Sequence, residues 1–402
     1  MRQLRIPAAF YRGGTSNAVV FHASDLPADR ALWPEIFLAA LGSPDPNGRQ
    51  LDGMGGGISS LSKVCVIGPP SRADADIDYS FFQIGVKDTT VDDSGNCGNM
   101  SSAMGPFAVD EGLVTVPPGQ AEALVRIHNT NTKKIIWSRF PMDEGQAGVD
   151  GAMAVPGVSG TGAPVRLEFR EPGGASTGKL LPTGRAVDTL DVPGVGRVRV
   201  SCIDAANACA FVRAEEVGLD GTEMPTALDT MTELLAKLEA IRCAASVAMG
   251  IAADVEAARK KPSIPKLGIV TVPKAAKTLS GEPIPVSEID VTGRMISIGQ
   301  PHRALPLTGA LCMAVAARVP GSIVHEANAS RDNPEADVRI GMPSGILVLA
   351  ASVTVQAGGA LHAEQAAVYR TARRLFDGQV YCRASRVPGV VGQGQGQRKA
   401  AE

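Results

Sequence analysis

The residue best placed to do chemistry in this 402-residue sequence is Cys97, within the segment Asp93-Ser-Gly-Asn-Cys-Gly-Asn-Met100. A short, uncharged helix over 98–112 is predicted to begin directly after it. The glycines on both sides let a ligand approach the backbone, and the free N–H groups of a helix's first turn attract an anion. The same helix end stabilises a thiolate, which would make Cys97 a usable acid or base. Most free cysteines are small buried hydrophobic residues, but these neighbours favour a site.

A lysine that enters an apolar strand is the second candidate. Lys63 ends the segment Leu51-Asp-Gly-Met-Gly-Gly-Gly-Ile-Ser-Ser-Leu-Ser-Lys63 and is followed by Val64-Cys-Val-Ile67. Burial disfavours the charged form of a lysine, so a lysine at the dry end of a strand can accept a proton. Lys63 is therefore a candidate general base for a weakly acidic C–H group. A lone lysine is usually a solvated surface residue, and the small neighbours argue against that here.

Weaker segments carry groups that could hold an anionic ligand. The turn Arg12-Gly-Gly-Thr-Ser-Asn17 offers N–H and hydroxyl donors, although it could equally be only a tight turn. The segment Pro301-His-Arg-Ala-Leu-Pro-Leu-Thr-Gly-Ala310 leads into a second uncharged helix and is evenly balanced between structure and binding. Arg242 could bind a substrate carboxylate or form a structural ion pair. Asn207 and Ser344 are candidates of low specificity.

Two helices must position these groups, one over 98–112 and one over 308–319. Both are nearly uncharged, and a helix that is apolar on all sides is a buried one. Each has short β-branched, strand-like runs before and after it, which predicts two halves, each a strongly bent sheet around one central helix. Further helices are predicted over 31–41, 226–250 and 360–376.

The chain is long enough for two or three domains with ample cores. A Pro/Gly-punctuated stretch near 184–194 suggests a boundary between domains at 1–185 and 186–377. A last strand near 378–388 is expected to return to the first domain. The low-complexity tail, 389–402, is predicted to be disordered.

Composition excludes several classes of protein. The 39 basic and 41 acidic side chains nearly balance, so the positive surface that a nucleic-acid-binding protein needs is missing. Hydrophobic residues make up 44% and charged residues 20%, which is usual for a folded protein. The N-terminus does not resemble a signal peptide, and no apolar run approaches the roughly 20 residues that span a bilayer. These features predict a cytoplasmic protein without membrane contact.

The sequence also argues against a metal or cofactor. The seven cysteines are odd in number and none forms a C-x-x-C pair, so neither a disulfide framework nor a structural zinc site is expected. No G-x-G-x-x-G in a βαβ context, P-loop or H-E-x-x-H motif occurs. We expect no cofactor.

Several of these segments together resemble the PrpF-like family, which includes aconitate isomerases, methylitaconate Δ-isomerase and 4-oxalomesaconate tautomerases. The resemblance runs through about residues 5–385 and is carried by Arg-Gly-Gly-Thr-Ser, Gly-Ser-Pro-Asp-Pro at 42–46, Asp-Gly-Met-Gly-Gly to Lys63, Ser-Gly-Asn-Cys-Gly-Asn and Leu-Pro-Thr-Gly. It implies an α+β, diaminopimelate epimerase-like fold of two similar domains, each a barrel-like sheet around a central helix. It also implies a site in the cleft between the domains, with both helix N-termini facing one multiply carboxylated substrate.

Three positions depart from what the resemblance implies. The epimerases carry an acid/base cysteine at each central helix, but the position matching the second cysteine is Pro306, and Cys312 lies deeper in the helix as a packing residue. Asn17 stands where many relatives are expected to have lysine, and Met342 stands where relatives are expected to have histidine. With one cysteine and one lysine, proton transfer along one face of an alkene is better supported than two-face racemisation.

The sequence therefore predicts a cofactor-independent 1,3-allylic isomerase or tautomerase of an unsaturated di- or tricarboxylate, with Lys63 and Cys97 as catalytic residues. A racemase or epimerase of the same superfamily and a non-catalytic carboxylate-binding accessory protein are the alternatives. The small carboxylate is the expected partner, and a homodimer is the expected assembly. The predicted substrate-binding residues are Gly14, Thr15, Ser16, Asn17, Met54, Gly55, Ser60, Asn96, Gly98, Asn99, Asn207, Arg242, His302, Arg303, Thr308, Gly309 and Ser344.

Overall fold

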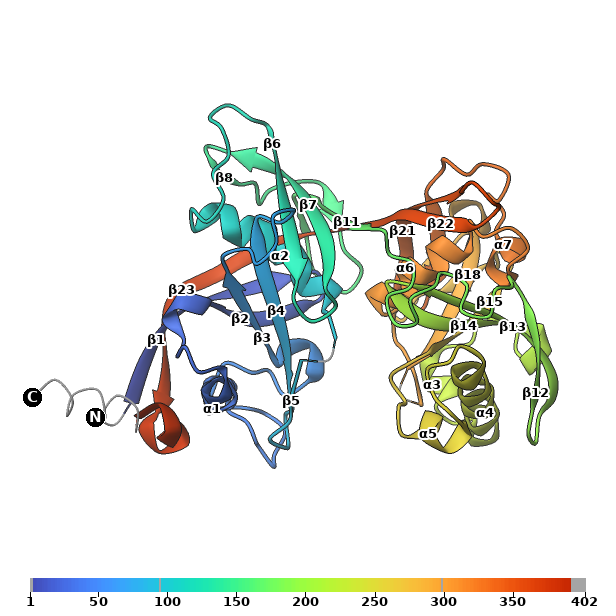
Figure 1. Cartoon of the computed structure of the whole chain (residues 1–402), viewed down its shortest axis with the longest axis horizontal. Coiled ribbons are helices and arrows are strands. Elements are labelled where there is room, and N and C mark those ends of the chain that lie inside the picture. The colour runs from blue at the N-terminus through green and yellow to red at the C-terminus, as the bar shows by residue number, and fades with distance from the viewer. Residues whose placement is uncertain (1–2, 94, 298, 392–402) are drawn as a thin grey trace, which may run out of the picture. The chain divides into compact units, whose positions relative to one another are not determined.

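The computed structural model describes residues 3–93, 95–297 and 299–391, coloured along the chain in Figure 1. It divides the chain into two compact units. Unit 1 extends to Leu167 and resumes at Arg370, and unit 2 comprises Glu168–Tyr369. Each unit is described separately below.

These unit borders lie before those that the sequence suggested, near 185 and 377. The glycine-rich segment after Leu167 is held within unit 2, because the Asp204 carboxylate accepts hydrogen bonds from the N–H groups of Ser176 and Thr177 at 2.8 and 2.6 Å. The segment rich in proline and glycine is therefore part of unit 2 and does not mark the border between the units.

The longer strands of unit 1 form a bent, mainly antiparallel sheet. They are β1 (Gln3–Gly13), β2 (Ser16–His22), β3 (Lys63–Gly68), β4 (Ile77–Ile84), β6 (Glu122–Asn129), β7 (Lys134–Asp143) and β23 (Ala372–Arg383). Their order is β23–β1–β2–β3–β4–β6–β7. The pairs β2/β3 and β4/β6 are parallel. The C-terminal strand β23 returns to pair with β1, as expected.

Helix α2 (Gly98–Asp110) lies inside this sheet, in contact with β1, β2, β3, β6, β7 and β23. Met100, Met104 and Phe107 are each at most 1% exposed. Small residues let strands approach the helix closely: a Cβ at Gly105 would lie 2.5 Å from the Ser138 hydroxyl. The predicted buried helix is therefore the core of unit 1.

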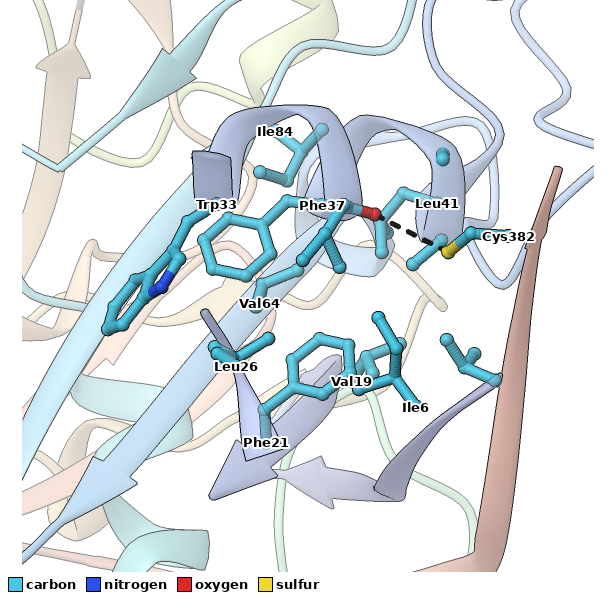
Figure 2. Close-up of a cluster of buried hydrophobic side chains, with 14 of the residues drawn as sticks. Ile6, Val19, Phe21, Leu26, Trp33, Phe37, Leu41, Val64, Ile84 and Cys382 are labelled. Atoms are coloured by element: carbon cyan, nitrogen blue, oxygen red, sulfur yellow. Dashed lines mark hydrogen bonds between the residues drawn. The ribbon is translucent and has the colours of Figure 1, made fainter. Parts of the chain in front are cut away.

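A second hydrophobic cluster of unit 1 lies between α1 (Trp33–Leu41) and strands β1, β2, β3 and β23. Figure 2 shows Phe37 and Trp33 of the helix above Val64, Val19 and Ile6 of the strands, with Cys382 from the C-terminal strand at one side. The Cys382 thiol donates to the Ile36 carbonyl. The cluster anchors the strand that carries Lys63, because Val64 follows it directly.

Unit 2 repeats the strand order of unit 1. Its longer strands are β12 (Asp188–Val192), β13 (Gly196–Ala205), β14 (Asn207–Arg213), β15 (Lys266–Thr271), β18 (Val291–Ser297), β20 (Val338–Met342), β21 (Gly345–Val355) and β22 (Leu361–Arg370). They pair in that order, again with two parallel pairs, β14/β15 and β18/β20. Helix α6 (Leu307–Ala316) is the buried central helix, in contact with β13, β14, β15 and β21.

The predicted helix over 226–250 is divided in the structure. α3 (Pro225–Leu228) and α4 (Thr232–Ala248) are separated by a turn in which the Thr230 hydroxyl donates to the Ala227 carbonyl, a local bond that competes with helix continuation. Leu238 and Ile241 of α4 pack on the strands of unit 2. No helix in the described part of the chain combines the length and apolar character that crossing a membrane requires.

Two other predictions are wrong. The segment 360–376 forms strands, not a helix, since β22 pairs with β21 and β23 pairs with β1. Its Ala- and Arg-rich composition favours a helix, but the sheet pairing overrides that preference. Residues 388–391 form a helical turn instead of a disordered start to the tail, and the Gly389 N–H donates to Glu35 at 3.0 Å. Residues 392–402 lie outside the described residues.

Short elements complete the fold. The remaining helices are α5 (Val255–Arg259) and α7 (Ile323–Ala327), and the remaining strands are β5 (Val91–Asp92), β8 (Gln146–Ala147), β9 (Met153–Ala154), β10 (Thr161–Gly162), β11 (Val165–Arg170), β16 (Ala276–Lys277), β17 (Pro283–Ile284) and β19 (Gln300–Pro301).

Candidate active site

Lys63 is the first residue of β3, and its side chain is only 7% exposed. It lies directly opposite Gln83 of β4 in the antiparallel pairing, and its Nζ donates to the Gln83 side-chain oxygen. The same Nζ lies 5.2 Å from the centre of the Phe81 ring. The hydrogen bond to Gln83 therefore positions the amine, and little of the side chain contacts water.

Gln83 is oriented for this role by its own hydrogen bonds. Its side-chain nitrogen donates to the carbonyls of Ser59 and Ser62 at 3.0 and 2.9 Å. Both partners are acceptors, so the amide oxygen must face the other way, toward Lys63. Sequence analysis missed Gln83, because its closeness to Lys63 follows from the register of two strands.

Cys97 is the N-cap residue of α2, with an extended backbone conformation and a half-buried side chain. Its carbonyl accepts from the Ser101 N–H at 2.9 Å, and its side chain caps no N–H group. The thiol is thus free to meet a ligand at the positive end of the helix. Ser94 of the same motif lies outside the described residues.

Asn96 is turned into the protein. Its side-chain oxygen accepts from Ser101 Oγ at 3.2 Å and from Asn129 Nδ2 at 3.3 Å. These contacts hold the segment before α2, so we now assign Asn96 to positioning Cys97 and not to direct substrate contact.

A buried thiol lies on the same face of β3 as Lys63. Cys65 lies two residues after Lys63 on β3, is fully buried, and its thiol approaches the Tyr79 hydroxyl at 3.9 Å. Burial raises the pKa of Cys65, the charge of Cys97 raises it further, and the Lys63 cation lowers it. Lys63 and Cys97 are thus both within electrostatic reach of one buried group. Cys65 itself stays a neutral thiol.

The turn between β1 and β2 packs against the first turn of α2. A Cβ at Gly13 would lie 2.6 Å from the Asn99 carbonyl oxygen, and one at Gly14 would collide with the Asn99 side chain. Gly14 also has a φ of +49°, which a glycine adopts without strain. These contacts place the exposed Thr15 hydroxyl 3.0 Å from Asn99 Nδ2. The predicted residues Gly14, Thr15, Gly98 and Asn99 are therefore brought together.

Arg370 adds a buried cation to this group. Its Nε donates to Asn99 Oδ1 at 3.1 Å, and the residue is 8% exposed. Burial lowers the pKa of Arg370 to about 10, so the guanidinium still carries its charge at neutral pH. Together with the N-terminus of α2 it makes this end of unit 1 attractive to an anion. Arg370 is distant in sequence from every motif, and no local signal marks it.

Unit 2 contains a parallel arrangement at the start of α6. Pro306 is the N-cap of α6, the position that Cys97 holds in α2. Asn207, the first residue of β14, donates through Nδ2 to the Thr308 hydroxyl at 3.2 Å. Asn207 Oδ1 is buried without a hydrogen-bond partner among the described residues. The structure thus brings together the predicted residues Asn207, Thr308 and Gly309. Asn207 Oδ1 could accept a hydrogen bond from a ligand.

Lys266 is a second lysine at the start of a strand. It begins β15, which has the place in unit 2 that β3 has in unit 1, and its Nζ donates to Ser263 O at 3.2 Å and Ser297 Oγ at 3.3 Å. A Cβ at Gly309, in the first turn of α6, would lie 3.5 Å from its Cδ. Burial lowers the pKa of Lys266. It is a candidate acid/base group or carboxylate ligand that sequence analysis missed.

Arg242 does not belong to a substrate site. Its guanidinium is 2% exposed, pairs with both carboxylate oxygens of Glu239 at 2.7 Å, and donates to the carbonyls of Ala258, Lys261 and Ile264. These partners leave no N–H group of the guanidinium for a ligand, so the prediction that Arg242 binds substrate is wrong.

Other predicted residues serve the loop before Lys63. The Met54 N–H donates to the Ala40 carbonyl and its side chain packs against the α1 cluster. A Cβ at Gly55 would collide with Gln50, a buried residue that bonds to Ser43, Ser62 and Gly57. Met54 and Gly55 are therefore better explained as parts of the loop than as ligands. Ser60 is half-buried at the end of the same loop.

The remaining predicted residues have diverse environments. Ser16 is 3% exposed, and Asn17 lies across from Arg12 in the β1/β2 pairing. His302 and Arg303 are exposed, and His302 Nδ1 lies 2.8 Å from the Ala304 carbonyl. Ser344, in the turn after β20, has a buried hydroxyl with no partner among the described residues, while Met342 is buried.

Comparison with known proteins identifies the family. Residues 3–383 match the model of the family described as "PrpF protein". The chain belongs to the PrpF family. A 3-methylitaconate isomerase of Eubacterium barkeri is 40% identical over 384 residues, covering 94% of this chain and 97% of that protein. A 2-methyl-aconitate isomerase of Cupriavidus necator is 37% identical over 397 residues, covering 96% and 98%.

Solved structures confirm the predicted fold. The crystal structure of a methylitaconate-delta-isomerase, 39% identical, matches with a TM-score of 0.86 over 96% of this chain and 98% of that one. A hydroxyproline epimerase from Agrobacterium vitis matches with a TM-score of 0.51 at 12% identity, over 95% of this chain and 94% of that one. That second likeness concerns the fold alone. The PrpF chain thus has the two-part, epimerase-like architecture expected from its sequence.

Gln83 offers a direct test of how the PrpF site holds its lysine. Gln83→Leu should lower kcat about 10-fold, because a hydrogen bond to a charged group, worth about 1.5–3 kcal/mol, is lost. Steady-state rates measure the effect. A wild-type rate in Gln83→Leu would show that the hydrogen bond from Lys63 to Gln83 does not position the amine.

Proposed function

We propose that this chain moves a carbon–carbon double bond within a small unsaturated di- or tricarboxylate, by proton transfer through Lys63 and Cys97 and without a cofactor. The observation that carries the proposal is the buried Lys63 amine, which Gln83 orients, in the same unit as Cys97 at the start of α2. The relatives named above are isomerases of methylitaconate and methylaconitate, which supports the same reaction class.

The geometry supports a two-step transfer. The Lys63 amine would remove a proton from the carbon next to the double bond, acting as a general base. The electron pair left behind would spread over the allyl system into a carboxylate, giving a dienolate. The N–H groups at the start of α2 and the Arg370 guanidinium would stabilise that charge. Lys63 or Cys97 would then return a proton to the far carbon of the allyl system, leaving the double bond moved by one position.

Each unit contains a positively charged region that favours an anionic ligand. Arg370 and the α2 N-terminus supply positive potential in unit 1, and Lys266 with the first turn of α6 supplies it in unit 2. Carboxylates are among the anions that such donors bind through charge-assisted hydrogen bonds. Aconitate, methylitaconate and 4-oxalomesaconate are the candidate substrates.

One observation favours a second candidate function, an epimerase or racemase. Two-face proton exchange needs an acid/base group on each side of a carbon, and Pro306 cannot supply the second. Lys266, with its pKa lowered by burial, is an acid/base candidate at the start of the equivalent strand of unit 2. We rank this second because its Nζ is already engaged by Ser263 and Ser297.

All seven cysteines are free in the structure, which suits a reducing compartment. We therefore place the proposed activity in the cytoplasm.

Proton NMR in D₂O tests the proposal. The purified chain is incubated with trans-aconitate, cis-aconitate, a methylitaconate or 4-oxalomesaconate, and the signals of the allylic and vinylic protons are followed. A shifted double bond, or deuterium at an allylic position, is the expected result and also names the substrate. Exchange confined to stereocentres would support the epimerase. Line-broadening of a ligand without exchange would replace the enzyme by a carboxylate-binding protein.

Cys97→Ser should lower kcat and leave the fold intact. The loss should be comparable to, or smaller than, the loss caused by Lys63→Ala. A hydroxyl fits the place of the thiol at the N-cap, but it is a far weaker acid at neutral pH. The measurement is the rate of double-bond movement, with circular dichroism as a check of folding. Cys382→Ser, at a buried thiol of the same unit that donates to the Ile36 carbonyl, is the matched control. Near-wild-type turnover in Cys97→Ser would return Cys97 to a packing role.

A further inference from the structure

Unit 1 contains a cavity of about 280 Å³ that takes no part in the site described above. It lies where β1 and β23 meet, beneath the segment 149–162, and Arg12 and Arg373 line it. Its volume equals that of roughly nine water molecules, which is room for a small polyatomic ion.

Arg12 and Arg373 are directly opposite one another in the β1/β23 pairing. Like charges at such positions repel and destabilise the pair of strands. Among the described residues, no carboxylate is ion-paired with either guanidinium. Arg12 Nη1 donates only to the carbonyls of Gly14 and Thr371, at 3.0 and 2.9 Å. Burial lowers the pKa of Arg12, and the charge of Arg373 lowers it further. A local conflict of this kind is typical of a functional position.

The two arginines belong to the opposite face of the sheet from the candidate active site. Side chains alternate between the faces of a strand, and a Cβ at Gly13 would point to the Asn99 carbonyl of α2. Arg12 therefore projects away from α2. Its other cross-strand neighbour, Asn17, adds an amide to this face and no compensating charge. The row Asn17–Arg12–Arg373 thus forms a positive surface distinct from the surroundings of Lys63 and Cys97.

We propose that Arg12 and Arg373 bind a small multivalent anion, a di- or tricarboxylate or inorganic phosphate, in this cavity. Two acceptor groups of one anion can engage both guanidinium groups with charge-assisted hydrogen bonds and remove their repulsion. The hydroxyl groups of Ser159 and Thr161 line the same cavity as further donors. Asp150 also lines it and opposes anion binding.

Isothermal titration at constant ionic strength tests the proposal, with tricarballylate, a saturated tricarboxylate, and with inorganic phosphate as probes. Wild-type chain should bind at least one of the two at a site that Arg373→Glu weakens at least 10-fold. Asp150→Asn should tighten that site. Arg5→Gln, which removes an exposed charge from the same β1 strand, should leave it unchanged. Binding of phosphate alone would identify an inorganic occupant of the same site.

Thermal unfolding separates binding from folding. Arg373→Glu replaces a repulsive pair by an attractive one, so its midpoint without anion should equal or exceed that of wild type. Each anion that binds should raise the wild-type midpoint more than the variant midpoint. Identical titrations of wild type and Arg373→Glu with both anions would overturn the proposal. The site should persist in Lys63→Ala whether or not the chain is an isomerase, so its failure is distinguishable from failure of the proposed function.

Discussion

Lys63→Ala is expected to lower kcat at least about 100-fold, the usual size of the loss when a general base is removed. The amine is 7% exposed, and its position depends on Gln83, so a water molecule entering the vacated space would be a much weaker base. The fold should survive, because truncation leaves mainly the Gln83 acceptor unpaired, a cost of about 1–3 kcal/mol. The measurement is the rate of double-bond movement by NMR, with circular dichroism as the folding check.

Two controls sharpen this result. Lys87→Ala removes an exposed lysine of unit 1 and should leave the rate unchanged. Addition of a small primary amine to Lys63→Ala should restore part of the activity with a pH dependence set by the added amine. A wild-type rate in Lys63→Ala would remove Lys63 from the mechanism. If Lys63→Ala loses both its activity and its fold, Lys63→Met separates the two effects, because methionine keeps the aliphatic volume of the side chain and removes the amine.

The central features of the fold could be predicted because their signals are local. The segments around 98–110 and 307–316 are apolar on all sides, and only burial inside a sheet satisfies such a helix. The prediction of a helix over 360–376 is wrong for the opposite reason. Its composition favours a helix, whereas its structure is decided by pairing with β21 and β1, which come from distant parts of the chain. The duplicated strand order of the two units became visible only from the pairings.

The residues of the candidate site also differ in whether a local sequence signal marks them. Cys97 and Lys63 could be found because glycine-rich segments adjoin them in sequence. Gln83 depends on the register of β3 and β4, and Arg370 reaches Asn99 from the far end of the chain. Lys266 has no motif around it, and its significance follows from the equivalence of β15 and β3. Such residues are placed by long-range topology, which a single sequence does not display.

Arg242 shows how the same limit produces a wrong assignment, and it gives the second large prediction. Arg242→Met should lower the free energy of unfolding by about 1–3 kcal/mol, because the partners of the buried guanidinium lose their charged donor. Glu239 would lose both of its hydrogen bonds from the guanidinium, and the carbonyls of Ala258, Lys261 and Ile264 would lose their donor. Denaturant unfolding followed by circular dichroism measures the loss.

The double variant Arg242→Met/Glu239→Leu decides between a structural and a substrate-binding role for this arginine. Replacing both charges by apolar side chains removes the uncompensated carboxylate, so part of the stability lost in Arg242→Met should return. The kcat and KM of the folded double variant should match the wild type, since the guanidinium faces only groups of unit 2. A stable Arg242→Met protein with a raised KM would contradict this, because a carboxylate ligand changes substrate affinity without supporting the fold. The burial of the guanidinium and its five hydrogen bonds to Glu239 and three carbonyls favour the structural outcome.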